Sequence, residues 1–458
     1  MFIARENELA KLNDMYDSDR FECAVVYGRR RVGKTTLISE FCKDKKTIFF
    51  ASMETEAKQN LEAFSGAIFG VGDKPYGEAS FLSFQSALDA VGELAAAERL
   101  ILVIDEYPYL AKSYKSISSI LQNTIDHKFK KTKLFLILCG SSMSFMEKQV
   151  LGYKSPLYGR RTAQFKILPF DYKETARWFP DFSTEDKLLV YGITGGIPLY
   201  LEEIRQNKTV DENILDNMLN RNAMLFEEPS NLLKQELREP QTYNAIITAI
   251  ADGKTKLSEI SGTIGLDSGN CVKYINNLIT LGILKKEAPL TDGKNKSVYL
   301  IADGLFRFWY RFVPKNMSSI MSGKMKENYK HSVKPFLADF MGLAFEEICK
   351  QYLEKYAPLP LSQGTIGQWW GANPKTKKQA QIDIVMLSSD GKEAIVGSCK
   401  YRNDPTGLDE LELLKEYAEA MGGNRKNYYY IFSKAGFKKG LLNSAEPVEL
   451  IALEKLFE

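Results

Sequence analysis

Residues 25–39 read VVYGRRRVGKTTLIS, and this stretch decides the fold. The apolar residues 24–27 predict a buried strand, and the spacing of Leu37, Ile38 and Phe41 predicts a helix after the loop. Between the two lies G-x-x-x-x-G-K-T, in the strand-then-helix context that a phosphate-binding loop requires. The stretch therefore predicts a nucleotide site, and a glycine-rich turn that binds nothing is the alternative.

The chemistry of this loop explains the prediction. Gly28 and Gly33 allow the backbone to curl so that its N–H groups point inward at a phosphate chain. Lys34, at the positive end of the helix, can reach the β- and γ-phosphates, and the Thr35 hydroxyl can ligate Mg²⁺. The residues expected to contact the nucleotide are Gly28, Arg29, Arg30, Arg31, Val32, Gly33, Lys34, Thr35 and Thr36.

The composition limits the class of protein. A chain of 458 residues predicts about three domains, and 44% hydrophobic with 26% charged residues is typical of a globular protein. A net charge of +3 gives no global field that selects nucleic acid, so such a partner needs a local basic patch. Six scattered cysteines without C-x-x-C indicate buried thiols in a reducing compartment, and two histidines make a histidine-based zinc or triad site improbable. The start has no signal-peptide layout and no apolar run reaches ~20 residues, so we expect a cytoplasmic protein without membrane contact.

A second apolar run, residues 100–104, ends in Asp105 and Glu106. Five apolar residues in a row fit a strand buried on both faces. At the carboxyl edge of a sheet beside the loop, Asp105 would hold Mg²⁺ and Glu106 would orient or deprotonate the attacking water. A merely solvated carboxylate pair is the alternative.

Further candidate residues for the nucleotide site lie later in the first domain. Ser141 comes after the apolar run 134–139 and is a candidate to sense the γ-phosphate, with capping of the next helix as the alternative. Arg160 and Arg161 can place a guanidinium against the γ-phosphate, from the same chain or from a neighbouring subunit in an oligomer. A solvated arginine pair is the alternative.

Strands and helices alternate through the first 200 residues, which predicts an α/β fold with a mostly parallel sheet. The ordered motifs RENEL, GRRRVGKT, LVIDEYPYL, LCGSSMSFM, SPLYGRRT and GGIPLYL resemble prokaryotic P-loop ATPases of the AAA+/STAND kind, often called the archaeal ATPase family. The resemblance covers about residues 1–210. It implies ATP and Mg²⁺ as cofactors, Lys34, Thr35, Asp105 and Glu106 as the residues that act on the nucleotide and Mg²⁺, and a nucleotide-sensing turn at residues 196–198.

The middle of the chain differs from the first 200 residues in composition and in its predicted secondary structure. Residues 201–239 are charged and helical, as in a lid. Residues 240–313 contain three predicted helices and a hairpin, which together indicate a winged helix-turn-helix domain. Its third helix offers the candidate DNA contacts Asn270, Lys273, Asn276 and Asn277, and the candidate phosphate contacts are Lys254, Lys256, Lys294 and Lys296. A protein-interaction module is the alternative use of this domain. Residues 314–339 read as a linker or an exposed helix.

Residues 340–458 predict a further α/β domain, and residues 340–435 resemble the PD-(D/E)xK nuclease superfamily, the restriction-endonuclease-like fold. The resemblance implies a site of Glu346, Asp383, Ser398 and Lys400. Position 398 is Ser where the superfamily has Glu or Asp, so one metal ligand is absent and a degenerate module is expected. An ion pair of Asp383 with Lys400 is the structural alternative.

These patterns favour an ATP-driven switch that acts on nucleic acid through its later domains. A slowly hydrolysing regulatory module that binds a protein client is the first alternative, and an ATP-dependent DNA endonuclease is the second. The client, any DNA sequence preference and the oligomeric state are not encoded in these patterns.

Overall fold

The computed structural model describes residues 2–71, 80–291, 296–362 and 364–458. The chain divides into two compact units, Met1–Pro169 (unit 1) and Phe170–Glu458 (unit 2). The boundary lies upstream of residue 200, the predicted end of the first domain. The first helices of unit 2 pack against helices that come far later in the chain, which accounts for this position.

Unit 1 is built on a parallel five-stranded sheet in the order β2-β3-β4-β1-β5. The strands are β1 Glu22–Tyr27, β2 Thr47–Ala51, β3 Leu100–Asp105, β4 Leu134–Gly140 and β5 Ala163–Lys166. The helices are α1 Glu6–Asp17, α2 Lys34–Cys42, α3 Ala57–Phe69, α4 Phe84–Ala97, α5 Tyr107–Ser113, α6 Ile117–His127 and α7 Met143–Phe145. Short helical turns are η1 Phe129–Lys131 and η2 Met146–Val150. The predicted parallel α/β sheet is therefore confirmed.

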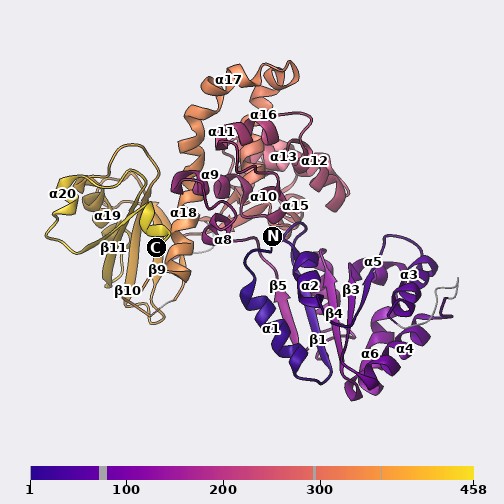
Figure 1. Cartoon of the computed structure of the whole chain (residues 1–458). Coiled ribbons are helices and arrows are strands. Elements are labelled where there is room, and N and C mark those ends of the chain that lie inside the picture. The colour runs from indigo at the N-terminus through magenta and orange to yellow at the C-terminus, as the bar shows by residue number, and fades with distance from the viewer. Residues whose placement is uncertain (1, 72–79, 292–295, 363) are drawn as a thin grey trace. The chain divides into compact units, whose positions relative to one another are not determined.

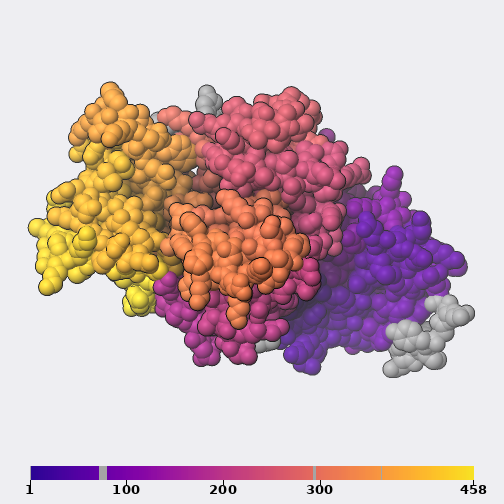
Figure 2. Space-filling view, turned by 90° about the horizontal axis from the view of Figure 1, so that it is seen from above, coloured from indigo at the N-terminus to yellow at the C-terminus, as the bar shows by residue number. Residues whose placement is uncertain are grey.

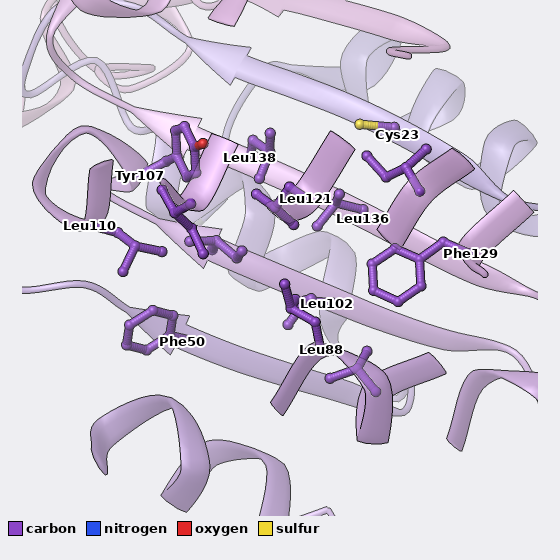
Figure 3. Close-up of a cluster of buried hydrophobic side chains, with 14 of the residues drawn as sticks. Cys23, Phe50, Leu88, Leu102, Tyr107, Leu110, Leu121, Phe129, Leu136 and Leu138 are labelled. Carbon is purple, nitrogen blue, oxygen red and sulfur yellow. The ribbon is translucent and has the colours of Figure 1, made fainter. Parts of the chain in front are cut away.

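Every residue of β1, β3 and β4 is buried, because apolar side chains of the helices cover both faces of this sheet. One face packs against α1 and α2, and the other against α3, α4 and α6. Figure 3 shows the second of these layers, in which Leu102 of β3 and Leu136 of β4 face Leu88 of α4. Strands buried on both faces need the continuous apolar runs seen in the sequence.

Unit 2 begins with helices, most of which are labelled in Figure 1. They are α8 Tyr172–Ala176, α9 Thr184–Thr194, α10 Pro198–Glu202, α11 Val210–Asn213, η3 Ile214–Met218, α12 Met224–Glu236, α13 Pro240–Ala251, α14 Leu257–Ile264 and α15 Ser268–Thr280. An antiparallel pair follows, β6 Leu284–Glu287 with β7 Val298–Ile301. The three predicted helices and two strands of this region are present. The hairpin turn at residues 292–294, with Lys294, lies outside the described residues.

The next helices are α16 Gly304–Met321, α17 Met325–Ser332, η5 Lys334–Phe336 and α18 Leu337–Lys355. Residues 314–339 are therefore largely helical, in agreement with the helix alternative to a linker. The aromatic run 305–313 forms the first half of α16 and is mostly buried, with Phe308 and Phe312 against Phe340 of α18. The segments of unit 2, coloured magenta to yellow, adjoin one another in the space-filling view (Figure 2).

The chain ends in a mixed five-stranded sheet of order β12-β11-β10-β9-β8. Its elements are β8 Ile366–Ala372, β9 Gln379–Leu387, β10 Glu393–Lys400, α19 Leu408–Met421, β11 Lys426–Ser433, α20 Lys439–Leu442, β12 Val448–Ala452 and η6 Glu454–Leu456. Strands β8, β9 and β10 are antiparallel neighbours, whereas β10, β11 and β12 run parallel. Both α18 and α19 pack against β9 and β10. The predicted helix, hairpin, helix and strand are present in that order.

Candidate functional site

The glycine-rich loop joins β1 to α2 at the carboxyl edge of the first sheet. The loop starts at Gly28, where a Cβ atom would lie 2.3 Å from the carbonyl oxygen of Ile167, so only glycine allows this backbone approach. It ends at Gly33, which has φ 83° directly before the helix. Arg31 also has a positive φ, 73°. Thr35 and Thr36, in the first turn of α2, are exposed.

Lys34 and Thr35 connect the loop to the second predicted motif. The Lys34 ammonium donates to the carbonyl of Arg29 at 2.9 Å. Burial is the largest influence on the pKa of Lys34 and lowers it, despite the nearby carboxylates. The Thr35 hydroxyl donates to Oδ2 of Asp105 at 2.9 Å. The structure therefore brings together the predicted phosphate and magnesium residues. Two oxygen groups in contact suit a hard divalent cation, so this pair fits Mg²⁺.

Glu106 lies next to this pair. Its backbone is left-handed, with φ 48°, and its Oε2 accepts from the Ser141 hydroxyl at 3.0 Å and from the Ser141 amide at 3.3 Å. Ser141 is the predicted sensor, and in the structure its hydroxyl holds the carboxylate predicted to act on water. Ser142, the residue before α7, makes no side-chain cap bond to that helix.

Two residues of this site escaped the sequence analysis. Ser52, directly after β2, places its hydroxyl 2.7 Å from the carbonyl oxygen of Asp105 and 2.6 Å from that of Glu106. Tyr109 of α5 accepts a hydrogen bond from Arg30 at 2.6 Å. The position of Ser52 at the end of a predicted strand was the available signal, whereas Tyr109 had none.

The two predicted arginines contact their own unit. Arg160 donates to Oδ2 of Asp126 through Nε at 3.0 Å and Nη2 at 2.6 Å, and to the carbonyls of Pro156 and Tyr158. Arg160, together with Lys130, lowers the pKa of Asp126 to about 2. Arg161 donates to the Leu151 carbonyl at 3.3 Å and lies 5.6 Å from the ring centroid of Tyr158. Arg160 therefore braces a loop through an ion pair and is not a solvated side chain.

The candidate DNA contacts lie on α15 in unit 2, with exposed side chains at Asn270, Lys273, Asn276 and Asn277. Lys273 donates to Oδ1 of Asn270 at 3.1 Å, and Asn277 donates to the Tyr243 hydroxyl at 2.7 Å. Just beyond β6, the Leu290 amide donates to the Gln368 carbonyl of β8 at 2.9 Å. The two-stranded sheet is thus joined to the C-terminal sheet.

The predicted C-terminal residues also come together. Lys400 lies 4.0 Å from Oδ2 of Asp383 and 3.0 Å from Oε1 of Glu410. Ser398 donates its hydroxyl to the same Oε1 at 2.7 Å. Burial alone would lower the pKa of Lys400, but the two carboxylates outweigh burial and raise it. Glu410, in the first turn of α19, was missed because nothing in its sequence surroundings marks it.

Glu346 of α18 belongs to the same region. It accepts from the Gln368 amide at 2.6 Å, and burial together with the Asp383 charge raises the pKa of Glu346 to about 7. Lys350 and Lys285 offset this shift only in part. Across the described ranges of the chain, no three carboxylate, cysteine or histidine groups converge as a metal site would require. The arrangement is a network of charges in which Glu410 supplies a carboxylate beside Ser398.

Comparisons with known proteins show which families the chain resembles. A family model described as an ATPase domain predominantly from Archaea matches residues 2–204, and one for archaeal and bacterial proteins of unknown function matches residues 309–416. An uncharacterized protein of Methanocaldococcus jannaschii is 32% identical over 425 residues, which are 92% of this chain and 91% of that protein. An uncharacterized ATP-binding protein of the same organism is 44% identical over 46 residues, 10% of this chain and 78% of its own length.

A solved structure shares the fold. The Walker-type ATPase of Pyrococcus abyssi aligns with a TM-score of 0.51 and 19% identity, over 68% of this chain and 96% of that one. Within the residues that the structure describes, no helix has the length and apolar character to cross a membrane.

The raised pKa of Glu346 gives a prediction for stability. Because the folded-state pKa of about 7 exceeds the ordinary 4.5, unfolding releases a proton in this window and stability falls as the pH rises through it. Glu346→Gln removes this penalty and is expected to stabilise the protein at about pH 8 by roughly 3 kcal/mol, with little change near pH 4. Urea unfolding across this pH range measures the effect. Glu327→Gln, at an exposed position, is the control. Parallel pH profiles of wild type and Glu346→Gln would contradict the prediction.

Proposed function

The chain belongs to the archaeal P-loop ATPase family, and from this premise we propose that it is an ATP-driven switch acting on nucleic acid. ATP and Mg²⁺ bind unit 1, and the nucleotide state controls what unit 2 contacts. The observation that carries the proposal is the convergence of the loop, the Thr35–Asp105 pair and the Glu106–Ser141 pair at one edge of the sheet. Nucleotide sites lie at such edges.

The roles of the individual groups follow from their positions. Inward-facing amides of residues 28–34 would cradle the phosphates, and Lys34 would exchange the Arg29 carbonyl for phosphate oxygens. Mg²⁺ held by Thr35 and Asp105 would neutralise charge on the phosphates. Glu106 is the group that orients or deprotonates water, and Ser141 holds its carboxylate in place or senses the γ-phosphate.

For the later part of the chain we keep the domain boundaries predicted from the sequence. We assign residues 201–239 to a helical lid, 240–313 to a winged helix and 340–458 to a nuclease-like module. The exposed polar face of α15 supports DNA contact through Asn270, Lys273 and Asn277. Ser at position 398 supports a degenerate module used for binding, because this site lacks one of the charges that a hard cation needs.

A second candidate, an ATP-dependent endonuclease, is favoured by one observation. Glu410 brings a carboxylate to the place where Ser398 lacks one, and contacts both Ser398 and Lys400. With Glu346 and Asp383 nearby, the charges of a phosphodiesterase site are present, although contributed by a different element.

The ATPase proposal predicts that one substitution lowers kcat and that another weakens ATP binding. Glu106→Gln is expected to bind ATP with nearly unchanged affinity and to lower kcat by about 100-fold or more, because the base is lost while the phosphate contacts remain. Lys34→Ala is expected to weaken ATP binding. Calorimetry and phosphate release measure both effects. Glu62→Gln, half exposed on α3, is the matched control. Hydrolysis at the wild-type rate by either Lys34→Ala or Glu106→Gln would refute the mechanism.

Contact with DNA predicts a salt dependence. We expect duplex DNA to be retained at low salt and released as salt rises, and Lys273→Ala to reduce the slope of log K against log salt by about 0.9, one phosphate contact. Fluorescence anisotropy over a salt series measures this slope. Lys439→Ala, at an exposed position in α20, is the control. Absence of DNA binding even at low salt would favour the regulatory module with a protein client.

The endonuclease candidate is tested by cleavage. If Glu410 completes the site, wild-type protein with Mg²⁺ or Mn²⁺ should nick plasmid DNA, and Glu410→Gln should abolish nicking. Glu412→Gln, exposed on the same helix, should leave it intact. An inactive wild type in which the exchange Ser398→Glu with Glu410→Ser creates cleavage would instead support the degenerate module.

A further inference from the structure

Arg5 is a buried arginine outside the predicted nucleotide contacts. Its side chain is 7% exposed, and Nη2 donates to the Val32 carbonyl at 3.3 Å and to the Leu168 carbonyl. Nη1 lies 3.5 Å from Oε1 of Glu8. One guanidinium therefore joins three segments: the start of the chain, the phosphate loop and the segment after β5.

The backbone around Arg5 is held in an unusual form. Ala4 and Arg5 both have positive φ, 61° and 70°. Residues other than glycine rarely adopt this conformation, and it persists where surrounding contacts impose it. A buried charge also needs partners. The contacts with Val32, Leu168 and Glu8 supply these partners, so the geometry serves to hold the guanidinium in this place.

The Val32 contact bears directly on phosphate binding. The Val32 carbonyl and the Gly33 amide belong to one peptide group. When the Arg5 guanidinium donates a hydrogen bond to this carbonyl, its positive charge polarises the whole peptide group, including the Gly33 N–H. A polarised amide is a stronger donor to an anion. Arg5 thus lies on the side of the loop to which the Val32 carbonyl points, and the Gly33 amide of the same trans peptide group points the opposite way.

The Leu168 contact lies where the chain leaves unit 1. The Ile167 amide donates to the Tyr27 carbonyl at 2.7 Å, and Gly28 packs against the Ile167 carbonyl. Pro169 ends unit 1. On the other side, the Phe170 amide donates to the Gly196 carbonyl at 2.8 Å, in the turn before α10. The connection is therefore a few residues long and bonded at both ends.

We propose that Arg5 is a positioning residue that couples the phosphate loop to the exit segment, residues 167–170. When nucleotide draws the loop amides inward, the Val32 carbonyl moves with them, and Arg5 passes this displacement to Leu168 and so to the turn at Gly196. The inference rests on the proposed ATP-driven switch and names the element of unit 1 through which the switch acts.

The experiment is hydrogen exchange with mass spectrometry on the full chain, with and without a non-hydrolysable ATP analogue and Mg²⁺. In wild type we expect the analogue to slow exchange in residues 28–36 and also in residues 167–170. Arg5→Met keeps an unbranched apolar side chain and removes the donors of the guanidinium. It is expected to weaken analogue binding by about tenfold. At saturating analogue it should retain protection of residues 28–36 and lose the change in residues 167–170.

Arg99→Met is the matched control. Arg99 also donates to backbone carbonyls of separate segments, Met15 at 2.7 Å and Lys133 at 3.0 Å, but does not contact the loop. It should keep the wild-type response in both regions. Arg5→Lys, which keeps the charge but cannot present the planar fork, should show a reduced response in residues 167–170 and serves if Arg5→Met does not fold.

The outcomes separate the two claims. A wild-type response of residues 167–170 in both Arg5 variants would overturn the role of Arg5. Protection of residues 28–36 alone in wild type would overturn the coupling while leaving ATP binding in place. Protection of neither region in wild type would refute the proposed function itself.

Discussion

The burial of apolar side chains on both faces of the first sheet is the constraint on which the first unit depends. The hydrogen bond between the Thr35 hydroxyl and the Asp105 carboxylate is a contact that this packing makes possible. It joins the first turn of α2 to the end of β3, although β4 lies between β1 and β3 in the sheet. The apolar layers on both faces fix the three strands in register, and so their carboxyl ends meet at one edge. The glycine-rich loop and the carboxylates of Asp105 and Glu106 are therefore brought together by the burial of apolar side chains in the sheet and its helices.

Backbone strain is concentrated at Glu106, which lies at the same edge of the sheet. Glu106 has a left-handed backbone, which a glutamate adopts only under constraint. The Ser52 hydroxyl donates to the backbone carbonyl of Glu106, and the Ser141 hydroxyl donates to the Glu106 carboxylate. Contacts from residues that follow two neighbouring strands thus fix both the backbone and the carboxylate of Glu106.

In the second unit, buried charges are balanced within one network. Lys400 is tolerated because Asp383 and Glu410 both face it. Glu346 lacks equal compensation, and the raised pKa of its carboxyl is the result. Two helices, α18 and α19, each bring a carboxylate to the strands. Glu410 of α19 lies beside Ser398 of β10, so a helix supplies the carboxylate at this position of the strand.

The sequence by itself determined the parallel sheet, the phosphate loop, the Asp105–Glu106 pair, and the placing of Asp383 and Lys400 on adjacent strands. These features depend on local rules, since glycines permit the turn, and continuous apolar runs specify strands buried on both faces. Only the tertiary structure decided the partners. Arg5 meets Leu168 across 163 positions, Arg160 meets Asp126 across 34, and Ser398 meets Glu410 across 12. The physical reason is that such contacts arise where separate elements pack together, and no periodicity in either segment records which element will lie opposite.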